Sequence, residues 1–308
     1  HCRLRRQRQM CIRDRNNFGP SYEFVYADDN DYSDGKVTQK TIQDIQSINK
    51  NDKPFFIAVG FRKPHLPFIA PKKYWDLYDK NEISLPSNNF FPPSAPQKAN
   101  YFYELRKFTD IPGKGPITES KAKELIHAYY ACVSYIDAQI GLILAELDNQ
   151  GLSDNTTVVL TSDHGFSLSE HGRWSKHNLF QYELKIPMII SSPKYEKNKT
   201  SESFVELVDL YPTFCDIAGL EIPDFAQGKS LISNLENPKK ITSDIAFSRW
   251  QNGETLISNK YYYTEWSLKG NLTHRMLYDI ENDELQMNNI AEIKSNKPIV
   301  DSLSIILN

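Results

Sequence analysis

Two short polar segments of this chain carry residue types that could hold a small anion beside a metal ion. Asp163 and His164 come directly after an apolar run, and a carboxylate with an imidazole can bind a hard or borderline cation. His65 follows another apolar run, and Lys176 lies thirteen residues beyond Asp163, with His171 between them. Positive donors around a metal ion suit a tetrahedral oxyanion such as sulfate or phosphate.

Each of these motifs also has a plain structural alternative. An Asp-His-Gly sequence at a strand end can be turn chemistry, with the aspartate capping a following helix. The X-Pro loop that contains His65 is common after strands, and a histidine there can simply be packed. His171 can form a hydrogen bond within its own loop and nothing more. The functional interpretation therefore depends on several motifs meeting at one edge of a sheet.

The elements that must position these residues alternate between apolar runs and amphipathic segments. The runs at 55–59, 156–161 and 187–191 predict strands buried on both faces of a sheet. The first two end at the polar motifs, and ligands of open α/β sheets bind outside the carboxyl ends of the strands. Apolar spacings of three and four predict helices at 38–50, 118–149 and 205–218. The expected fold class is α/β, a mostly parallel sheet flanked by helices.

The pattern changes after about residue 237. Segments 246–250, 254–258 and 260–266 are short, rich in aromatic residues and separated by turn residues. This pattern is typical of an antiparallel sheet, and a final helix at 301–307 could pack on it. We therefore expect an α/β domain over 16–237 and a small α+β subdomain over 238–308.

Residues 1–15 differ in composition from everything that follows. They contain six arginines and one acid, and Met10–Arg15 resembles the translation of a sequencing-library adapter, so we expect a non-native tail. The remaining 30 basic and 38 acidic residues give a net charge of about −8, which makes a nucleic-acid partner unfavourable. No apolar run is expected to span a membrane. Outside the tail, Cys132 and Cys215 are expected to be buried free thiols.

A family resemblance rests on these same motifs. Ser162-Asp163-His164-Gly165-Phe166, followed by Glu170-His171-Gly172, Trp174 and Lys176, is similar to the second signature region of the sulfatase family, within the alkaline phosphatase superfamily. The string VGFRKPHLPF at 59–68 resembles iduronate-2-sulfatase-like members in particular. The likeness extends in order over roughly 16–295, with further matches at 130–141, 204–220 and 277–283. It implies an alkaline-phosphatase-like fold, truncated at its N-terminal side.

The resemblance implies a role for each motif residue. Asp163 and His164 match ligands of an active-site calcium ion (Ca2+), and Lys176 matches a lysine that contacts the sulfate group. His65 matches a histidine that binds sulfate and can protonate the departing sugar oxygen, where cleavage of the S–O bond builds negative charge. His171 is a further candidate for substrate binding. The implied substrate is a sulfated carbohydrate outside the cytoplasm, so a periplasmic or extracellular (or lysosome-like) location is expected.

The chain departs from the family pattern at the nucleophile. The family uses a formylglycine made from Cys or Ser in a C/S-x-P/A-x-R motif. Cys2 and Cys11 have an arginine at the right spacing, but neither is followed by the required Pro or Ala. We therefore expect no nucleophile in this chain and no sulfatase activity from the chain alone. We also expect no signal peptide in it, because its start has no apolar segment of the kind a signal peptide needs. Two alternatives stay open: a phosphodiesterase or phosphonate hydrolase of the same superfamily, and a sulfatase-like binding module without catalysis.

Overall fold

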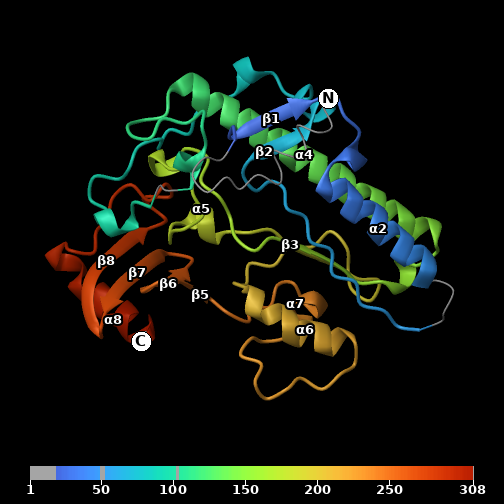
Figure 1. Cartoon of the computed structure of the whole chain (residues 1–308). Coiled ribbons are helices and arrows are strands. Elements are labelled where there is room, and N and C mark those ends of the chain that lie inside the picture. Colours follow the sequence, from blue (N-terminus) through green and yellow to red (C-terminus); the bar gives the residue numbers. More distant parts are fainter. Residues whose placement is uncertain (1–18, 49–52, 102–103, 308) are drawn as a thin grey trace. The chain divides into compact units, whose positions relative to one another are not determined.

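The computed structural model describes residues 19–48, 53–101 and 104–307, which form two compact units (Figure 1). The first unit lies within His1–Ser87 and Phe102–Thr156, and the second within Asn88–Tyr101 and Thr157–Asn308. The expected domain boundary at residue 237 falls inside the second unit, and it stays a prediction. The expected tail at 1–15 lies outside the described residues.

A long helix organises the first unit. Helix α4 (Glu119–Asn149) starts where the Thr118 side chain accepts a hydrogen bond from the backbone N–H of Lys121, at 3.3 Å, which satisfies one free amide of the first turn. Its apolar face packs against α2 (Ser33–Ile48), α3 (Lys72–Trp75) and β2 (Phe68–Pro71). Figure 1 shows α2 and α4 side by side. The helix ends near Gly151, whose φ of +67° suits a residue without a side chain.

By length and composition, α4 could also cross a membrane. The sequence predicts no membrane span, because it contains no unbroken apolar run of about 18–20 residues. Long helices of protein cores pass the same test, and α4 buries Leu125, Cys132 and Tyr135 inside its unit. Cys132 and Cys215 are both buried free thiols, as expected.

The first unit contains a parallel pair of strands but lacks one predicted strand. β1 (Tyr22–Val25) pairs in parallel with β2, which follows the loop that contains His65. The apolar run at 55–59 forms no strand among the described residues, and Phe56 is 74% exposed. An apolar run indicates that a segment prefers burial, but a strand also needs a neighbouring strand for its backbone hydrogen bonds. The described part of the unit provides none beside this segment.

The second unit contains the other two predicted strands and pairs them antiparallel. β3 (Val158–Thr161) lies against β4 (Met188–Ser191), with Val158 opposite Ser191. Around them lie three short helices: α5 (Gln181–Leu184), α6 (Leu210–Ile217) and α7 (Ile232–Glu236). Within the described residues, β1 with β2 is therefore the only parallel pair. The prediction of a mostly parallel sheet is wrong for these strands, because an apolar run specifies burial and not the direction of its partner.

The C-terminal segments form the predicted antiparallel sheet. The order is β5 (Ile245–Trp250), β6 (Gly253–Ser258), β7 (Tyr261–Leu268) and β8 (Asn271–Asp279). Helix α8 (Lys297–Leu307) packs on one face, where Val300 joins a core that includes Tyr263 and Leu277. The other face buries Trp266, Met276 and Tyr278 together with Leu179 and Phe180. The sheet thereby fixes the segment that follows Lys176.

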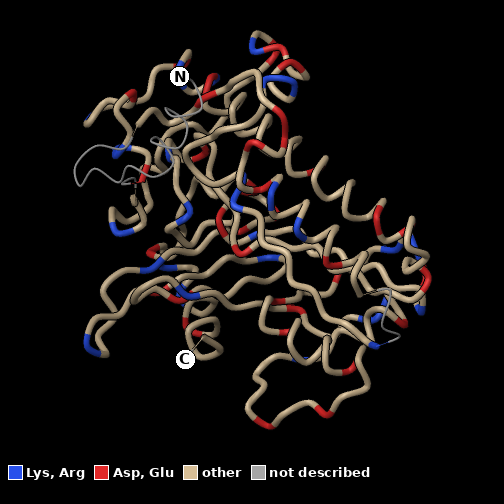
Figure 2. The backbone as a smooth tube through the Cα atoms, turned by 45° about the vertical axis from the view of Figure 1, so that its right-hand side comes forward, with Lys and Arg blue, Asp and Glu red and all other residues tan. Residues whose placement is uncertain are grey.

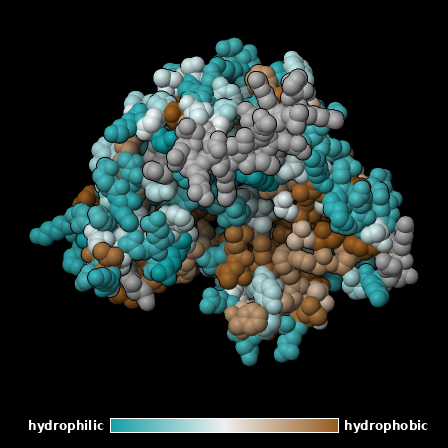
Figure 3. Space-filling model, in the orientation of Figure 1, coloured by the Kyte–Doolittle hydropathy of each residue, from teal (hydrophilic) through white to brown (hydrophobic). Residues whose placement is uncertain are grey.

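The two surface views show how charge and apolar groups are distributed. Acidic and basic residues are interspersed along the backbone trace in Figure 2. Apolar atoms gather over β3 and α6 in Figure 3, where the large exposed side chains include Leu160, Ile189 and Tyr211. An exposed apolar patch of this kind is unusual for a free surface.

Candidate functional site

The loop that contains His65 is fixed at its start by a buried carboxylate. Asp34, near the start of α2 and only 2% exposed, accepts hydrogen bonds from the backbone N–H groups of Arg62 and Lys63, at 3.0 and 3.1 Å. The Lys63 ammonium donates to the carbonyls of His65 and Pro67, at 2.8 and 2.6 Å. Burial lowers the pKa of Lys63, and the charge of Asp34 opposes that shift. These contacts give the loop one defined path toward β2.

The imidazole of His65 is oriented by two neighbours. Its Nδ1 lies 2.6 Å from the carbonyl of Leu66, which can only accept, so Nδ1 bears the hydrogen. Its Nε2 lies 3.4 Å from Oε1 of Glu104, where a carboxylate can accept a hydrogen bond from a protonated ring. Sequence reasoning missed Glu104, since no motif marks it and it lies thirty-nine residues along the chain.

Asp163 and His164 lie at the end of β3 with their side chains close together. His164 Nδ1 is 2.7 Å from the carbonyl of Gly165, so it donates there and leaves a lone pair on Nε2. That Nε2 lies 3.5 Å from Oδ2 of Asp163, and Oδ1 of Asp163 accepts from the N–H of His164 at 3.0 Å. The Asp163 side chain is 85% exposed, so it is open to a ligand.

This arrangement fits two ligands of one cation. Two ligand atoms about 2.4 Å from a calcium ion and at right angles to each other lie about 3.4 Å apart, close to the separation of Asp163 Oδ2 and His164 Nε2. Calcium takes roughly six to eight ligands, mostly oxygen. Among the described residues, no group of three or more His, Cys, Asp or Glu side chains could hold a metal ion. By itself the pair is therefore too small to complete a calcium shell, and its role as a metal site stays a prediction.

Lys176 belongs to a loop, residues 165–180, that is tied together internally. The N–H of Ser167 donates to the carbonyl of Ser175 at 3.0 Å, and the N–H of Ser169 to that of Arg173 at 2.9 Å. Arg173 and Glu183 form a fully buried ion pair, and Ser167 donates its hydroxyl to Glu183 at 2.5 Å. The Arg173 guanidinium also donates to the Ala99 carbonyl at 2.9 Å. These contacts hold the backbone at half-buried Lys176 in one conformation.

His171 occupies an interior position in the same loop. Its ring is fully buried, lies 4.3 Å from the Phe180 ring between centroids, and bonds the Leu285 carbonyl through Nε2 at 2.8 Å. Burial lowers its pKa to about 4, with the Arg173 charge adding to the shift. This environment favours the packing alternative over substrate binding, and we assign His171 no role in the proposed reaction.

Four of the five predicted site residues lie in the second unit and one in the first. Asp163 and His164 are in contact, and Lys176 lies on the loop that follows them. His65 lies in the first unit. Its convergence with the other residues on one site stays a prediction.

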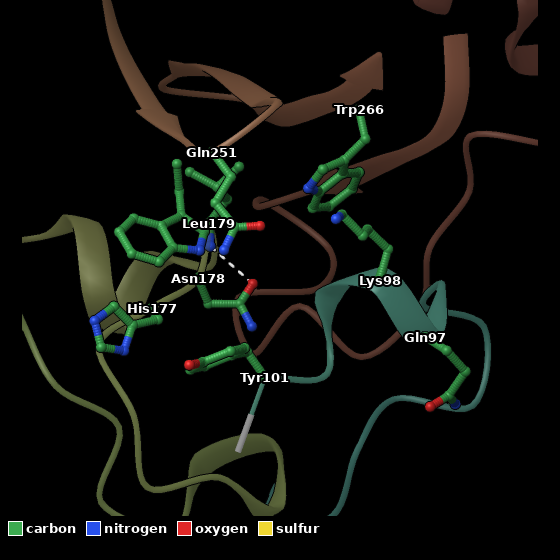
Figure 4. Close-up of a pocket in the computed structure, with 9 residues that line it drawn as sticks. Gln97, Lys98, Tyr101, His177, Asn178, Leu179, Gln251 and Trp266 are labelled. Atoms are coloured by element: carbon green, nitrogen blue, oxygen red, sulfur yellow. Dashed lines mark hydrogen bonds between the residues drawn. The ribbon is translucent and has the colours of Figure 1, made fainter. Parts of the chain in front are cut away.

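A pocket of about 250 Å3 lies within the second unit (Figure 4). Its lining includes His177, the residue after Lys176, together with Tyr101 and Trp250. Trp266 also lines it; its indole is 2% exposed and lies over Gly253, where a Cβ atom would come within 2.5 Å of the indole nitrogen. The close approach therefore requires a glycine.

Known proteins resemble this chain in both sequence and fold. The family model described as "Sulfatase" matches residues 7–220, and the model for the C-terminal part of N-sulphoglucosamine sulphohydrolase matches residues 169–308. Iduronate 2-sulfatase of Mus musculus is 32% identical over an alignment of 222 residues. The alignment covers 62% of this chain and 40% of that protein. A sulfatase of Formosa agariphila is 31% identical over 233 residues, 72% of this chain and 44% of that protein. The chain thus spans less than half the length of these relatives.

Solved structures share the fold. One, with bound D-glucosamine-2-N,6-O-disulfate, has a TM-score of 0.78 at 23% identity, covering 90% of this chain and 68% of that one. The phosphonate monoester hydrolase of Agrobacterium radiobacter has a TM-score of 0.79 at 20% identity, covering 99% and 67%. At these identities the likeness concerns the fold, and it confirms the expected α/β class. Since the family model covers more than half of its residues, the chain belongs to the sulfatase family.

Proposed function

We propose that the protein to which this chain belongs hydrolyses sulfate esters of a sulfated carbohydrate in the periplasm or outside the cell. One observation carries the proposal: Asp163 and His164 present two ligand atoms 3.5 Å apart, on the same unit as the internally tied loop of Lys176. Relatives named iduronate 2-sulfatase support the choice of a sulfated sugar.

The described residues would divide the work as follows. A calcium ion held by Asp163 and His164 would supply positive charge next to the sulfate oxygens. Lys176 would neutralise a further sulfate oxygen as a fixed cation. As the S–O bond breaks, a protonated His65 would donate its Nε2 proton to the departing sugar oxygen. The Leu66 carbonyl would hold the ring through Nδ1, and the nearby Glu104 carboxylate would stabilise the charged ring before the transfer. The nucleophile, a formylglycine in the family pattern, is assigned to no residue of this chain.

The test is a comparison of ester substrates with the full-length protein. We expect it to hydrolyse an aryl sulfate and a sulfated disaccharide much faster than the matched phosphonate monoester. The Lys176→Ala variant should lower kcat about 100-fold or more, since a preorganised charge in the site is lost. Lys194→Ala, which removes an exposed lysine of the same unit, should leave the rate unchanged.

Two outcomes would overturn the proposal. Faster turnover of the phosphonate ester would favour the phosphonate hydrolase alternative, and binding of the disaccharide without turnover of any ester would favour a binding module. The 308-residue chain alone should show no aryl sulfate turnover, because it lacks a recognised nucleophile. Measurable turnover by the chain would contradict that expectation.

A further inference from the structure

We propose that the pocket lined by His177 binds an acidic sugar residue adjacent to the one that bears the reacting sulfate. This inference rests on the proposed function, because it assigns to that substrate a second point of attachment. His177 and Asn178, which line the pocket, follow Lys176 directly in the chain, so the pocket and the lysine expected to contact sulfate share one loop. Its volume of about 250 Å3 suits a single ring better than an extended oligosaccharide.

The walls of the pocket are aromatic, as a sugar ring requires. The His177 and Trp250 rings lie 4.6 Å apart between centroids, tilted by 36°, and the Tyr101 and His177 rings lie 5.2 Å apart, nearly edge to face. Rings in this arrangement present flat, amphipathic surfaces that can pack against the apolar face of a pyranose. Figure 4 shows Tyr101 and His177 among the residues that line the pocket.

The polar groups of the pocket favour an anion. Among the side chains that line the pocket, Lys98 carries a positive charge and Gln251 an amide. None of the lining side chains is a carboxylate. In the part of the chain that the structure describes, Lys98 has no ion-pair partner. A carboxylate or sulfate on the bound sugar would therefore meet an uncompensated positive charge, whereas a neutral sugar would gain only the aromatic contacts.

Part of the pocket lining belongs to the core of the sheet. Trp266 is held in the sheet core with Leu179 and Tyr278, and it lies directly on the backbone of Gly253. Trp266 and Leu179 both line the pocket, so this part of the lining is fixed by packing that does not involve a ligand.

The decisive experiment measures the binding of two matched disaccharides to the 308-residue chain by titration calorimetry. The first is a sulfated disaccharide whose second residue is a uronic acid; the second is the same compound with its carboxyl group reduced to an alcohol. We expect Lys98→Ala to weaken binding of the acidic compound about tenfold and that of the reduced compound less than twofold. A third compound, with a sulfate in place of the carboxylate, shows whether the pocket accepts either anion.

The aromatic walls are tested with a variant on the same strand as its control. Trp250→Ala should weaken binding of both disaccharides about tenfold, and Trp250→Phe should retain most of the affinity. Phe247→Ala is the matched control, because Phe247 is exposed and lies on the opposite face of β5. Unchanged affinity in both Lys98→Ala and Trp250→Ala would overturn the proposal.

Kinetic measurements distinguish a wrong assignment of the pocket from a wrong assignment of the sulfatase function. An aryl sulfate has no second sugar, so Lys98→Ala in the full-length protein should leave its hydrolysis unchanged and raise KM for the acidic disaccharide. If the full-length protein hydrolyses the aryl sulfate but Lys98→Ala leaves KM for the disaccharide unchanged, the pocket assignment is wrong and the sulfatase assignment survives. If no sulfate ester is hydrolysed, the proposed function fails, whatever the disaccharide binding shows.

Discussion

At the scale of single residues, His171 shows how burial fixes a charge state. The ring is enclosed by Phe180 and Tyr182, and its pKa is lowered to about 4, chiefly because burial disfavours the charged form. The neighbouring Arg173 charge acts in the same direction, while the Leu285 carbonyl and Asp283 act against it. His171 is therefore neutral in the folded protein at any pH near neutrality.

This pKa predicts acid sensitivity of the fold. The unfolded chain binds a proton on this histidine below about pH 6.5, but the folded chain does so only below about pH 4. The free energy of unfolding should thus fall as the pH drops through this window, by about 3 kcal/mol in total. Urea unfolding at pH 7 and pH 5 measures how strongly the free energy of unfolding depends on pH.

The control is His171→Asn, because asparagine tolerates the φ of +51° at this position. This variant should have a lower free energy of unfolding at pH 7, and that free energy should depend less on pH. An equal slope in both proteins would exclude His171 as the source.

Residue types predicted part of the candidate site, and tertiary contacts supplied the rest. Asp163 with His164 could be singled out because their chemistry is local, and the structure brings their side chains together. Glu104 could not, because nothing in its sequence neighbourhood shows that it lies beside His65. The burial of His171 could not be predicted from the sequence either, because it depends on partners more than a hundred residues away, such as Leu285.

At the scale of elements, the loop 165–180 owes its conformation to one buried charge pair. Arg173 and Glu183 are both fully buried. Glu183 Oε1 also accepts from the Ser167 hydroxyl, and Arg173 Nη1 donates to the Ala99 carbonyl. Among the described residues, Arg173 Nε and Glu183 Oε2 have no hydrogen-bond partner. The Arg173 guanidinium also lies over the Phe180 ring, 4.7 Å from its centroid. Burial lowers the pKa of Arg173, and the charge of Glu183 opposes that shift.

Breaking this pair should be costly. Glu183→Ala leaves an unpaired buried guanidinium, so we expect a loss of roughly 3–5 kcal/mol in the free energy of unfolding. The double variant Arg173→Met with Glu183→Leu should lose much less, because no charge remains buried. Asp301→Ala is the control: it removes a partner of Lys297 in an exposed pair and should cost less than about 1 kcal/mol. Equal losses in the single and the double variant, measured by urea unfolding, would contradict this account.

Secondary structure was predictable where its signal is local and not where it depends on pairing. The regular apolar spacing over the thirty-one residues of α4 predicted that helix. The turn residues between short aromatic segments predicted the sheet of β5–β8. The direction of β3 against β4 could not be inferred, because an apolar run is the same for either orientation. For the run at 55–59, exposure of Phe56 depends on neighbours that its own sequence does not specify.

At the scale of the whole molecule, the proposed reaction draws on both units. His65 and Glu104 belong to the first, and Asp163, His164 and Lys176 to the second. Without residues 1–15 the chain carries a net charge of about −8, which would repel the sulfated carbohydrate proposed as the substrate over long distances. Local cations such as Lys176 and Lys98 must therefore provide the attraction at close range.

The metal requirement can be tested at this scale. As proposed, Asp163 and His164 would supply two of the roughly six to eight ligands that calcium takes, so calcium should raise the Tm of the 308-residue chain only slightly. In the full-length protein, EDTA should abolish sulfate ester hydrolysis and added calcium should restore it. Asp163→Asn should weaken that restoration, seen as a higher calcium concentration for half-maximal activity. Full activity in EDTA would refute a calcium-dependent site.

The contact between Trp266 and Gly253 makes the shape of the pocket depend on a single backbone position. A Cβ atom at residue 253 would lie 2.5 Å from the indole nitrogen and 2.8 Å from Leu179, and both of these side chains line the pocket. Gly253→Ala would therefore displace lining side chains without altering any residue of the lining itself. A residue outside the lining thus takes part in shaping the space available to a ligand.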